Sequence, residues 1–286
     1  MKILITGSNG FIGKNLSIHL KEQGHDIFKF TRDSKIDDLL EVVKESELIF
    51  HLAGENRPNN DEDFYKGNAD LTQHLCDYVR SYAKGVPIIF SSTKKISEQT
   101  SYGKSKLLAE EYLSKLSESN PIYILRLPGV FGKWSKPNYN SVVATFCYNI
   151  IRGLPININD PNAKIELLYI DDLISEFVNI INKRDKSNDV YLYNISKTVF
   201  INLNDLADMI LSFNELRGIS KVADTANGFE KNLYATFVSY LTADKFSYKL
   251  KPHIDSRGIF AEIIKTKSSG QFSYFTASPS EVRGEH

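Results

Sequence analysis

The first fifteen residues of the chain, MKILITGSNGFIGKN, restrict its fold more than any other stretch. The run from Ile3 to Ile5 is apolar and suits a strand that is buried on both faces. A helix is expected from Phe11 to Leu20, and three regularly spaced glycines surround its start: Gly7, Gly10 and Gly13. A strand, a glycine turn and a helix form the first half of a dinucleotide-binding βαβ unit.

Each glycine has a physical role in such a unit. Gly7 permits the tight turn, Gly10 lets a pyrophosphate approach the backbone, and Gly13 lets the helix pack close to the strand. Free N–H groups at the start of the helix face the phosphates. An ordinary turn without a ligand can have the same spacing, but its place directly after a strand favours cofactor binding. The expected cofactor contacts in this stretch are Gly7, Asn9, Gly10, Phe11, Ile12 and Gly13.

The composition bounds the domain count and the partners. The 286 residues, 42% of them hydrophobic, suit one large domain or one domain with a small appendage. Lys plus Arg and Asp plus Glu both number 35, so nothing indicates a nucleic acid or an anionic membrane as partner. No apolar run approaches the roughly 20 residues that span a bilayer, and a strand at the N-terminus leaves no room for a signal peptide. Cys76 and Cys147 are far apart, so we expect a cytoplasmic protein with reduced thiols, although a disulfide stays open.

Strands and helices alternate after the first βα pair. Strands are expected over residues 26–30, 47–52, 86–91 and 122–126, with helices over 37–44, 61–83 and 101–115 between them. This alternation predicts an α/β fold with a doubly wound parallel sheet of Rossmann type and helices on both faces. Ligands of such sheets bind at the carboxyl ends of the strands, so the residues just after each strand carry the functional information.

Two strand ends add candidates for cofactor binding. Arg32 follows the second strand, where an acidic residue would hold the ribose of NAD and an Arg accommodates the 2′-phosphate of NADP. We therefore favour NADPH/NADP, while the adjacent Asp33 and a merely solvated Arg32 keep NAD open. Arg57, after the third strand, either meets a substrate phosphate or forms a surface ion pair. That third strand ends in residues whose backbone can lie along the cofactor: Leu52, Ala53 and Gly54.

A Y-x-x-x-K pair, Tyr102 and Lys106, begins nine residues after Thr93, which ends the next strand. A chain with 15 tyrosines holds about one such pair by chance, and a second one, Tyr193 with Lys197, is present. The first pair begins an expected helix, where its members lie one turn apart on one face. The second lies in an expected strand, where residues four apart are about 13 Å distant. We therefore interpret the second pair as chance.

The first pair has a definite chemistry. A free tyrosine has a pKa of about 10, and a nearby ammonium with a cationic nicotinamide is expected to lower it. Tyr102 would then give a proton to a carbonyl oxygen as a hydride reaches the carbon. Thr93, with Ser92 as the second candidate, would hold that oxygen by a hydrogen bond. Lys106 would tune Tyr102 and hold the nicotinamide ribose, so the predicted catalytic residues are Thr93, Tyr102 and Lys106, and the last two also contact the cofactor.

Several motifs resemble those of the extended short-chain dehydrogenases/reductases. They are T-G-x-x-G-x-x-G, the Thr–Tyr–Lys set, RLPGVFGKWSKPNYNS at 126–141 and LLYIDDL at 167–173. HLAGENRP and F-G-K-W-x-K-P-N-Y-N-S resemble more particularly the CapF-type capsular-polysaccharide enzymes, in which a reductase domain precedes a cupin domain. The resemblance implies a homodimer whose reductase domain uses NADPH to reduce a UDP-linked 4-keto-6-deoxy-2-acetamido sugar. The cupin of that family first epimerises the keto sugar with a bound metal.

The pattern changes after Phe246, where no long helix is evident. Asp255 to Gly258 reads as a turn between two short strands, which resembles the entry strands of a cupin. A whole cupin needs about 100 residues, so we expect a short β segment of an incomplete cupin, left by a truncated gene, an engineered truncation or proteolysis. The epimerase activity is then expected to be lost. His286 is at most an orphaned ligand, because a metal site needs three or four, and no metal is predicted.

The expected domains are a reductase domain over 1–245 and a cupin-like fragment over 246–286. A smaller α/β substrate-binding region covers mainly 127–160 and 190–245. Gly129 departs from the family, which has an Asn there that is expected to orient substrate, so substrate affinity is in question. Asp171 and Asp172 cap a helix more simply than they bind a metal. The substrate candidates are Arg57, Asn138, Asn140 and Ser141, of which a polar loop and helix cap explains the last three equally well.

The leading hypothesis is NADPH-dependent reduction of the C4 keto group of a UDP-2-acetamido-2,6-dideoxy-4-keto-hexose. Such a step belongs to N-acetyl-L-fucosamine-type sugar biosynthesis for capsule or O-antigen. One alternative is a nucleotide-sugar epimerase or dehydratase with tightly held NAD. Against it, Lys94 and Lys95 stand where dehydratases of this group tend to carry Asp-Glu after the catalytic Thr. The other alternative is a fragment that binds cofactor without turnover.

Overall fold

The computed structural model describes residues 1–183, 187–268 and 270–281. The chain divides into two compact units, and each is described by itself. The first unit holds residues 1–130 and 166–198, and the second holds 131–165 and 199–286. The domain boundary expected at residue 245 stays a prediction.

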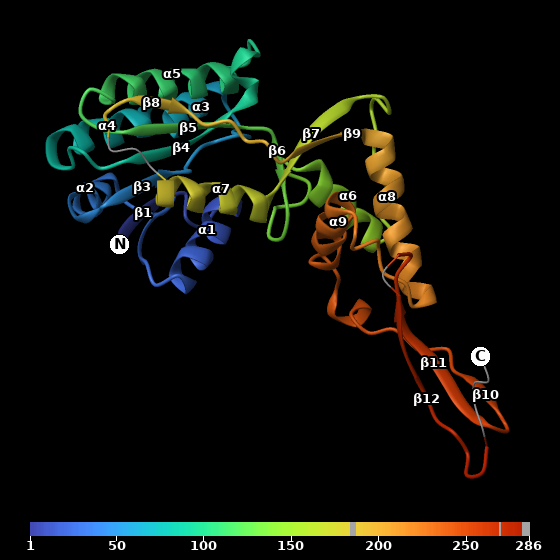
Figure 1. Cartoon of the computed structure of the whole chain (residues 1–286). Coiled ribbons are helices and arrows are strands. Elements are labelled where there is room, and N and C mark those ends of the chain that lie inside the picture. Colours follow the sequence, from blue (N-terminus) through green and yellow to red (C-terminus); the bar gives the residue numbers. More distant parts are fainter. Residues whose placement is uncertain (184–186, 269, 282–286) are drawn as a thin grey trace. The chain divides into compact units, whose positions relative to one another are not determined.

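A six-stranded parallel sheet forms the centre of the first unit (Figure 1). Its strands are ordered β2-β1-β3-β4-β5-β8, and each paired neighbour runs parallel to the next. Their bounds are β1 Lys2–Thr6, β2 Asp26–Phe30, β3 Leu48–His51, β4 Ile88–Thr93, β5 Ile122–Leu127 and β8 Val190–Leu192. The predicted doubly wound Rossmann-type sheet is confirmed.

Side chains alternate along each strand, so the sheet has two apolar faces. Helices pack on both of them and form two separate cores. Ile3 and Ile5 of β1 belong to one core, whereas Leu4 between them belongs to the other. The first core includes helices α1 Phe11–Glu22 and α7 Ile170–Lys183. The second includes α2 Ile36–Glu45, α4 Leu71–Tyr82 and α5 Ser101–Leu116.

The helix expected over residues 61–83 is built from three pieces. A short helix, α3 Asp61–Phe64, leads into a π-helical turn, Tyr65–Asp70, which then continues as α4. Such π-turns are rare and are found frequently at functional sites. The turn buries the polar Asn68, whose role is described below.

The second unit contains three main helices and most of the C-terminal strands. The helices are α6 Val142–Ile151, α8 Leu203–Leu216 and α9 Gly228–Val238. A three-stranded sheet is formed by β6 Gly129–Phe131, β7 Lys164–Tyr169 and β9 Thr198–Asn202, and the unit boundaries fall within or beside these strands. The smaller α/β region expected in addition to the main sheet is thereby confirmed, while its predicted bounds stay a prediction.

The C-terminal segment forms a separate antiparallel sheet. Its strands are β10 His253–Asp255, β11 Gly258–Lys265 and β12 Gln271–Phe275, in that order. The turn predicted at Asp255–Gly258 joins β10 to β11. His286 lies outside the described residues. Within the described part of the chain, no helix is long and apolar enough to cross a membrane.

Candidate active site

The glycine turn joins β1 to α1 at the carboxyl edge of the sheet. Gly7 has a left-handed φ of 69°, and a Cβ on it would lie 2.8 Å from the Ala53 backbone. A Cβ on Gly13 would lie 2.8 Å from Cα of Ser8 and closer still to the carbonyl oxygen of Gly7. Because the obstructing atoms are backbone, neither glycine can be replaced without moving the turn.

The start of α1 fits a bound pyrophosphate. The helix begins after Gly10 with no side-chain cap and with no acidic residue in its first turn, so its N–H groups and partial positive charge stay available to an anion. The hydroxyl of Ser8 in the same turn is buried and has no hydrogen-bond partner among the described residues. The predicted contacts Asn9 and Gly10 are exposed, and Phe11 and Ile12 are half-buried.

Thr93 and Tyr102 meet at the end of β4. Thr93 is the last residue of β4, and Tyr102 lies in the first turn of α5, whose start is capped by the hydroxyl of Thr100. The Tyr102 hydroxyl lies near enough to Thr93 for a polar interaction that lowers the pKa of Tyr102. The Tyr102 ring packs against Phe64 of α3 at 5.8 Å between centroids. Two of the three predicted catalytic residues therefore lie close together at the end of β4.

Ser92, the second candidate for the hydroxyl role, is engaged elsewhere. Its hydroxyl donates to a carboxylate oxygen of Glu110 on α5, and Arg126 of β5 binds the same carboxylate through Nε at 3.1 Å and Nη2 at 2.7 Å. Adjacent strand residues point to opposite faces. The geometry therefore favours Thr93 over Ser92 as the partner of Tyr102.

Lys106 is buried one turn after Tyr102, with only 4% of it exposed. Its Nζ donates to the carbonyl oxygen of Ser91 at 2.7 Å and lies 4.3 Å from the centroid of the Phe90 ring. Burial lowers the pKa of Lys106 to about 7, against the opposing effect of Glu110. A Cβ on Gly54 would lie 3.6 Å from this nitrogen, so the loop after β3 passes directly beside it.

The titration of Tyr102 differs from the expectation. Burial raises the pKa of Tyr102, and the hydrogen bond with Thr93 lowers it by a smaller amount. The Lys106 ammonium does not contribute to this shift. Its Nζ is buried and donates to the carbonyl oxygen of Ser91.

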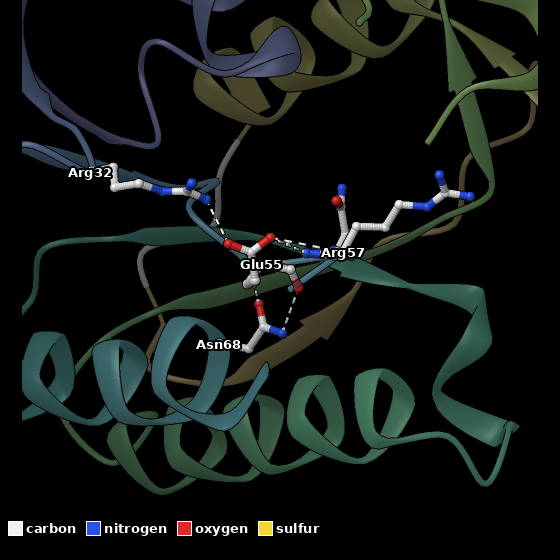
Figure 2. A network of polar contacts seen from close by, with 5 residues as sticks. Arg32, Glu55, Arg57 and Asn68 are labelled. Atoms are coloured by element: carbon white, nitrogen blue, oxygen red, sulfur yellow. Dashed lines mark hydrogen bonds and ion pairs between the residues drawn. The ribbon is translucent and has the colours of Figure 1, made fainter. Parts of the chain in front are cut away.

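The loop after β3 is held by Asn68, a residue that was not among the candidates predicted from the sequence. Glu55 N donates to Asn68 Oδ1 at 2.9 Å, and Asn68 Nδ2 donates back to the carbonyl oxygen of Glu55 at 2.9 Å. Asn68 Nδ2 also donates to the hydroxyl of Ser105 on α5 at 2.9 Å. Figure 2 shows the resulting network, in which Arg32 pairs with Glu55 at 2.6 Å. The predicted contacts Leu52 and Ala53 precede Glu55 in this loop and are half-buried, and Gly54 is exposed.

The predicted substrate contacts lie in both units. Arg57 is exposed, and its guanidinium points away from Glu55 (Figure 2). It forms none of the ion pairs found between described residues. In the second unit, Asn138 has a left-handed φ of 54° and is exposed, as is Asn140. Ser141 caps α6 by accepting from Ala144 N at 3.3 Å, which is the structural role considered for it.

Gly129, the departure from the family pattern, begins β6 in a crowded place. A Cβ there would lie 3.2 Å from the carbonyl oxygen of Glu166 and 3.3 Å from Cδ2 of Leu167. An Asn at this position would require β7 to shift by a few tenths of an ångström.

The second Y-x-x-x-K pair is not arranged like the first. The strand expected to include Tyr193 ends at Leu192, so Tyr193 lies just after it. The hydroxyl of Tyr193 donates to Glu176 at 2.8 Å, and Lys197 pairs with Asp172 at 3.4 Å. Asp171 and Asp172 lie in the first turn of α7, where acidic side chains favour the helix dipole.

His51 belongs to a series of buried hydrogen bonds that runs from Thr6, just before the glycine turn, to the backbone of Asn68. Its Nδ1 lies 2.8 Å from Oγ1 of Thr6, and its Nε2 lies 2.8 Å from Oγ1 of Thr72. Thr72 donates to the carbonyl oxygen of Asn68, so its hydroxyl accepts from Nε2–H, and Nδ1 must accept from Thr6. Protonation of Nδ1 would break the hydrogen bond that it accepts from Thr6. Burial, with a smaller effect of the Lys106 charge, lowers the pKa of His51 to about 3.

The buried His51 is expected to make the folded state less stable at acidic pH. Because its folded pKa is below its unfolded value of about 6.5, stability is lost as pH falls through about 6.5 and down towards the folded pKa. Between about pH 7.5 and about pH 5 the loss should be roughly 2 kcal/mol. We expect urea unfolding to show that His51→Gln lacks this part of the pH dependence. His74→Gln, at an exposed site on α4, should keep it; equal pH slopes for both variants would contradict the assignment.

Comparisons with known proteins agree with this geometry. A model described as the NAD dependent epimerase/dehydratase family matches residues 3–196, and a polysaccharide biosynthesis C-terminal domain model matches residues 253–286. A UDP-2-acetamido-2,6-beta-L-arabino-hexul-4-ose reductase of Pseudomonas aeruginosa is 45% identical over 289 residues, which cover 100% of this chain and 77% of that protein.

Solved structures are similar over most or nearly all of the chain. The crystal structure of capsular polysaccharide assembling protein CapF from Staphylococcus aureus matches with a TM-score of 0.85 and 38% identity, over 98% of this chain and 76% of that one. MoeE5 in complex with UDP-glucuronic acid and NAD shares the fold with a TM-score of 0.67 at 18% identity, over 75% of this chain and 83% of that one.

These similarities confirm the resemblance to the CapF-type enzymes. The matched family model spans well over half of the chain. The chain therefore belongs to the NAD dependent epimerase/dehydratase family and is an oxidoreductase of this nicotinamide-binding group.

Proposed function

We propose that this protein reduces the C4 keto group of a UDP-2-acetamido-2,6-dideoxy-4-keto-hexose with NADPH. The observation that carries the proposal is the proximity of Thr93, Tyr102 and the buried Lys106 at the end of β4, at the same sheet edge as the glycine turn. The 45% identity to a reductase named for a UDP-linked hexul-4-ose supports the substrate class. A homodimer, a cytoplasmic location and a place in capsule or O-antigen sugar biosynthesis are parts of the same proposal.

The residues of the site have distinct roles in the proposed reaction. A bound nicotinamide supplies the hydride to the carbonyl carbon. Tyr102 gives its hydroxyl proton to the carbonyl oxygen, which becomes the alcohol, and Thr93 orients that oxygen through its own hydroxyl. Lys106, buried one turn after Tyr102 on α5, holds the nicotinamide ribose.

The choice of NADPH rests on Arg32. Its side chain lies just after β2 and is 82% exposed, so it can reach a 2′-phosphate. The substrate contacts proposed are Arg57, Asn138, Asn140 and Ser141. Lys94, which distinguishes this chain from the dehydratases, is held in an ion pair with Glu166 at 2.5 Å.

The direct test mixes the protein with NADPH and a UDP-linked 4-keto sugar and follows the absorbance of the reduced nicotinamide. We expect stoichiometric loss of NADPH and formation of the C4 alcohol, verified by mass spectrometry. No NADPH consumption with any such keto sugar would contradict the proposal. Release of tightly bound NAD on denaturation, with epimerised or dehydrated product, would instead favour the alternative enzyme class.

A further inference from the structure

The Arg32–Glu55 ion pair connects the loops that follow β2 and β3, the two strands on either side of β1. Arg32 follows β2 and Glu55 follows β3, and β1 runs between these two strands. The glycine turn begins at the end of β1, with Gly7 N donating to the carbonyl oxygen of Phe30 in β2 at 2.8 Å. The pair therefore joins the two strand ends that flank the dinucleotide turn.

Glu55 is the fixed member of the pair. Its backbone is bonded in both directions by Asn68, and a Cβ on Gly67 would lie 2.8 Å from its Cβ, so its stem is packed against the π-helical turn. Its Oε1 accepts from the backbone N–H groups of Asn56 and Arg57 at 3.2 and 3.3 Å, and its Oε2 accepts from Arg32. Figure 2 shows the carboxylate held between these donors and Arg32.

Arg32 is the adaptable member. Its side chain is 82% exposed, against 18% for Glu55. An ion pair with such an exposed partner is weak and readily exchanged. A phosphate offers Arg a bidentate partner of higher charge than a carboxylate, so a 2′-phosphate can share or replace Glu55.

We propose that Glu55 sets the cofactor preference of this protein by competing with the 2′-phosphate of NADP for Arg32. Its negative charge offsets the guanidinium and repels the phosphate, whereas the 2′-hydroxyl of NAD is neutral and is little affected. Glu55 thus reduces the difference in binding affinity between NADPH and NADH that Arg32 produces, so that NADH can also bind. This inference rests on the proposed function, since it takes the glycine turn to bind a nicotinamide dinucleotide.

The test measures dissociation constants of NADPH and NADH by calorimetry on the full chain. Glu55→Gln keeps the amide-accepting oxygen and removes the charge. At the dielectric constant of water, removing one charge about 6 Å from a phosphate dianion changes affinity by about tenfold. We expect NADPH to bind Glu55→Gln about tenfold more tightly, while NADH binding stays within about twofold.

Two further variants complete the test. Asp77→Asn neutralises a carboxylate that pairs with Arg80 on α4 at 3.0 Å, so it is a matched control and should leave the NADH-to-NADPH ratio unchanged. Arg32→Gln should weaken the binding of NADPH and leave that of NADH unchanged. An unchanged or reversed ratio in Glu55→Gln, with both cofactors still bound, would overturn this inference and leave the proposed function standing. Failure of the unaltered protein to bind either cofactor would overturn both.

Discussion

Tyr102→Phe should lower turnover of the keto sugar by about a thousandfold while NADPH still binds. The substitution removes only the proton donor, and general acid catalysis of this kind contributes about 10²–10⁴-fold. The ring should keep its place, because it packs against Phe64 and is half-buried. Steady-state rates with saturating NADPH, together with calorimetric NADPH binding, measure the two effects separately.

Tyr193→Phe provides the matched control for this experiment. Tyr193 belongs to the other Y-x-x-x-K pair, and its hydroxyl donates to Glu176. Its loss should cost about 1 kcal/mol of stability and leave turnover close to that of the unaltered protein. Retention of more than about a tenth of the activity in Tyr102→Phe would show that another group is the main proton donor.

The sequence sufficed for the parallel sheet because its strands are short apolar runs separated by helical periodicity. The strand expected at residues 26–30 coincides with β2, and helix 101–115 differs from α5 by one residue. The break at residues 65–70 was not predictable from the periodic pattern. It depends on the fit of Gly67 and Asn68 against Glu55, which the fold brings beside them.

The candidate site was predictable where residues lie close in sequence or follow a strand. Thr93, Tyr102 and Lys106 have that property, and so do the glycines of the first turn. The supporting residues Asn68, Glu110 and Arg126 were missed because their partners lie 13 to 37 positions away along the chain. A polar residue on an otherwise apolar helix face was the available signal for Glu110, which is buried in α5.

Charge effects were the least predictable part of the site. The sequence places an ammonium one turn from Tyr102 and so suggests a lowered phenol pKa. It does not show that both groups are buried, which raises the pKa of Tyr102 and lowers that of Lys106 to about 7. Similarly, the sequence suggests that Arg32 is an unpaired cation, whereas in the structure it pairs with Glu55 at 2.6 Å.

Gly13→Ala should abolish cofactor binding and lower the thermal midpoint. Its Cβ would meet the backbone of Gly7 and Ser8 at distances that real Cβ atoms do not show, so α1 must move away from the turn that cradles the phosphates. Overpacking of this kind costs about 1–3 kcal/mol, or roughly 2–5 °C in the midpoint for a chain of this size. We expect NADPH affinity to fall by at least about a hundredfold, because the helix N-terminus no longer faces the phosphates.

Two other glycines separate this steric effect from a general effect of alanine. A Cβ on Gly10 would lie 3.1 Å from the carbonyl oxygen of Gly7, which is tight but not forbidden, so Gly10→Ala should weaken NADPH binding by less than Gly13→Ala. Gly228 begins α9 with no atom within 4 Å of an added Cβ, so Gly228→Ala should leave both NADPH binding and the midpoint unchanged or raise the midpoint slightly. Circular dichroism at the binding temperature verifies that each variant is folded. Normal NADPH binding by folded Gly13→Ala would refute the assignment of this turn to the pyrophosphate.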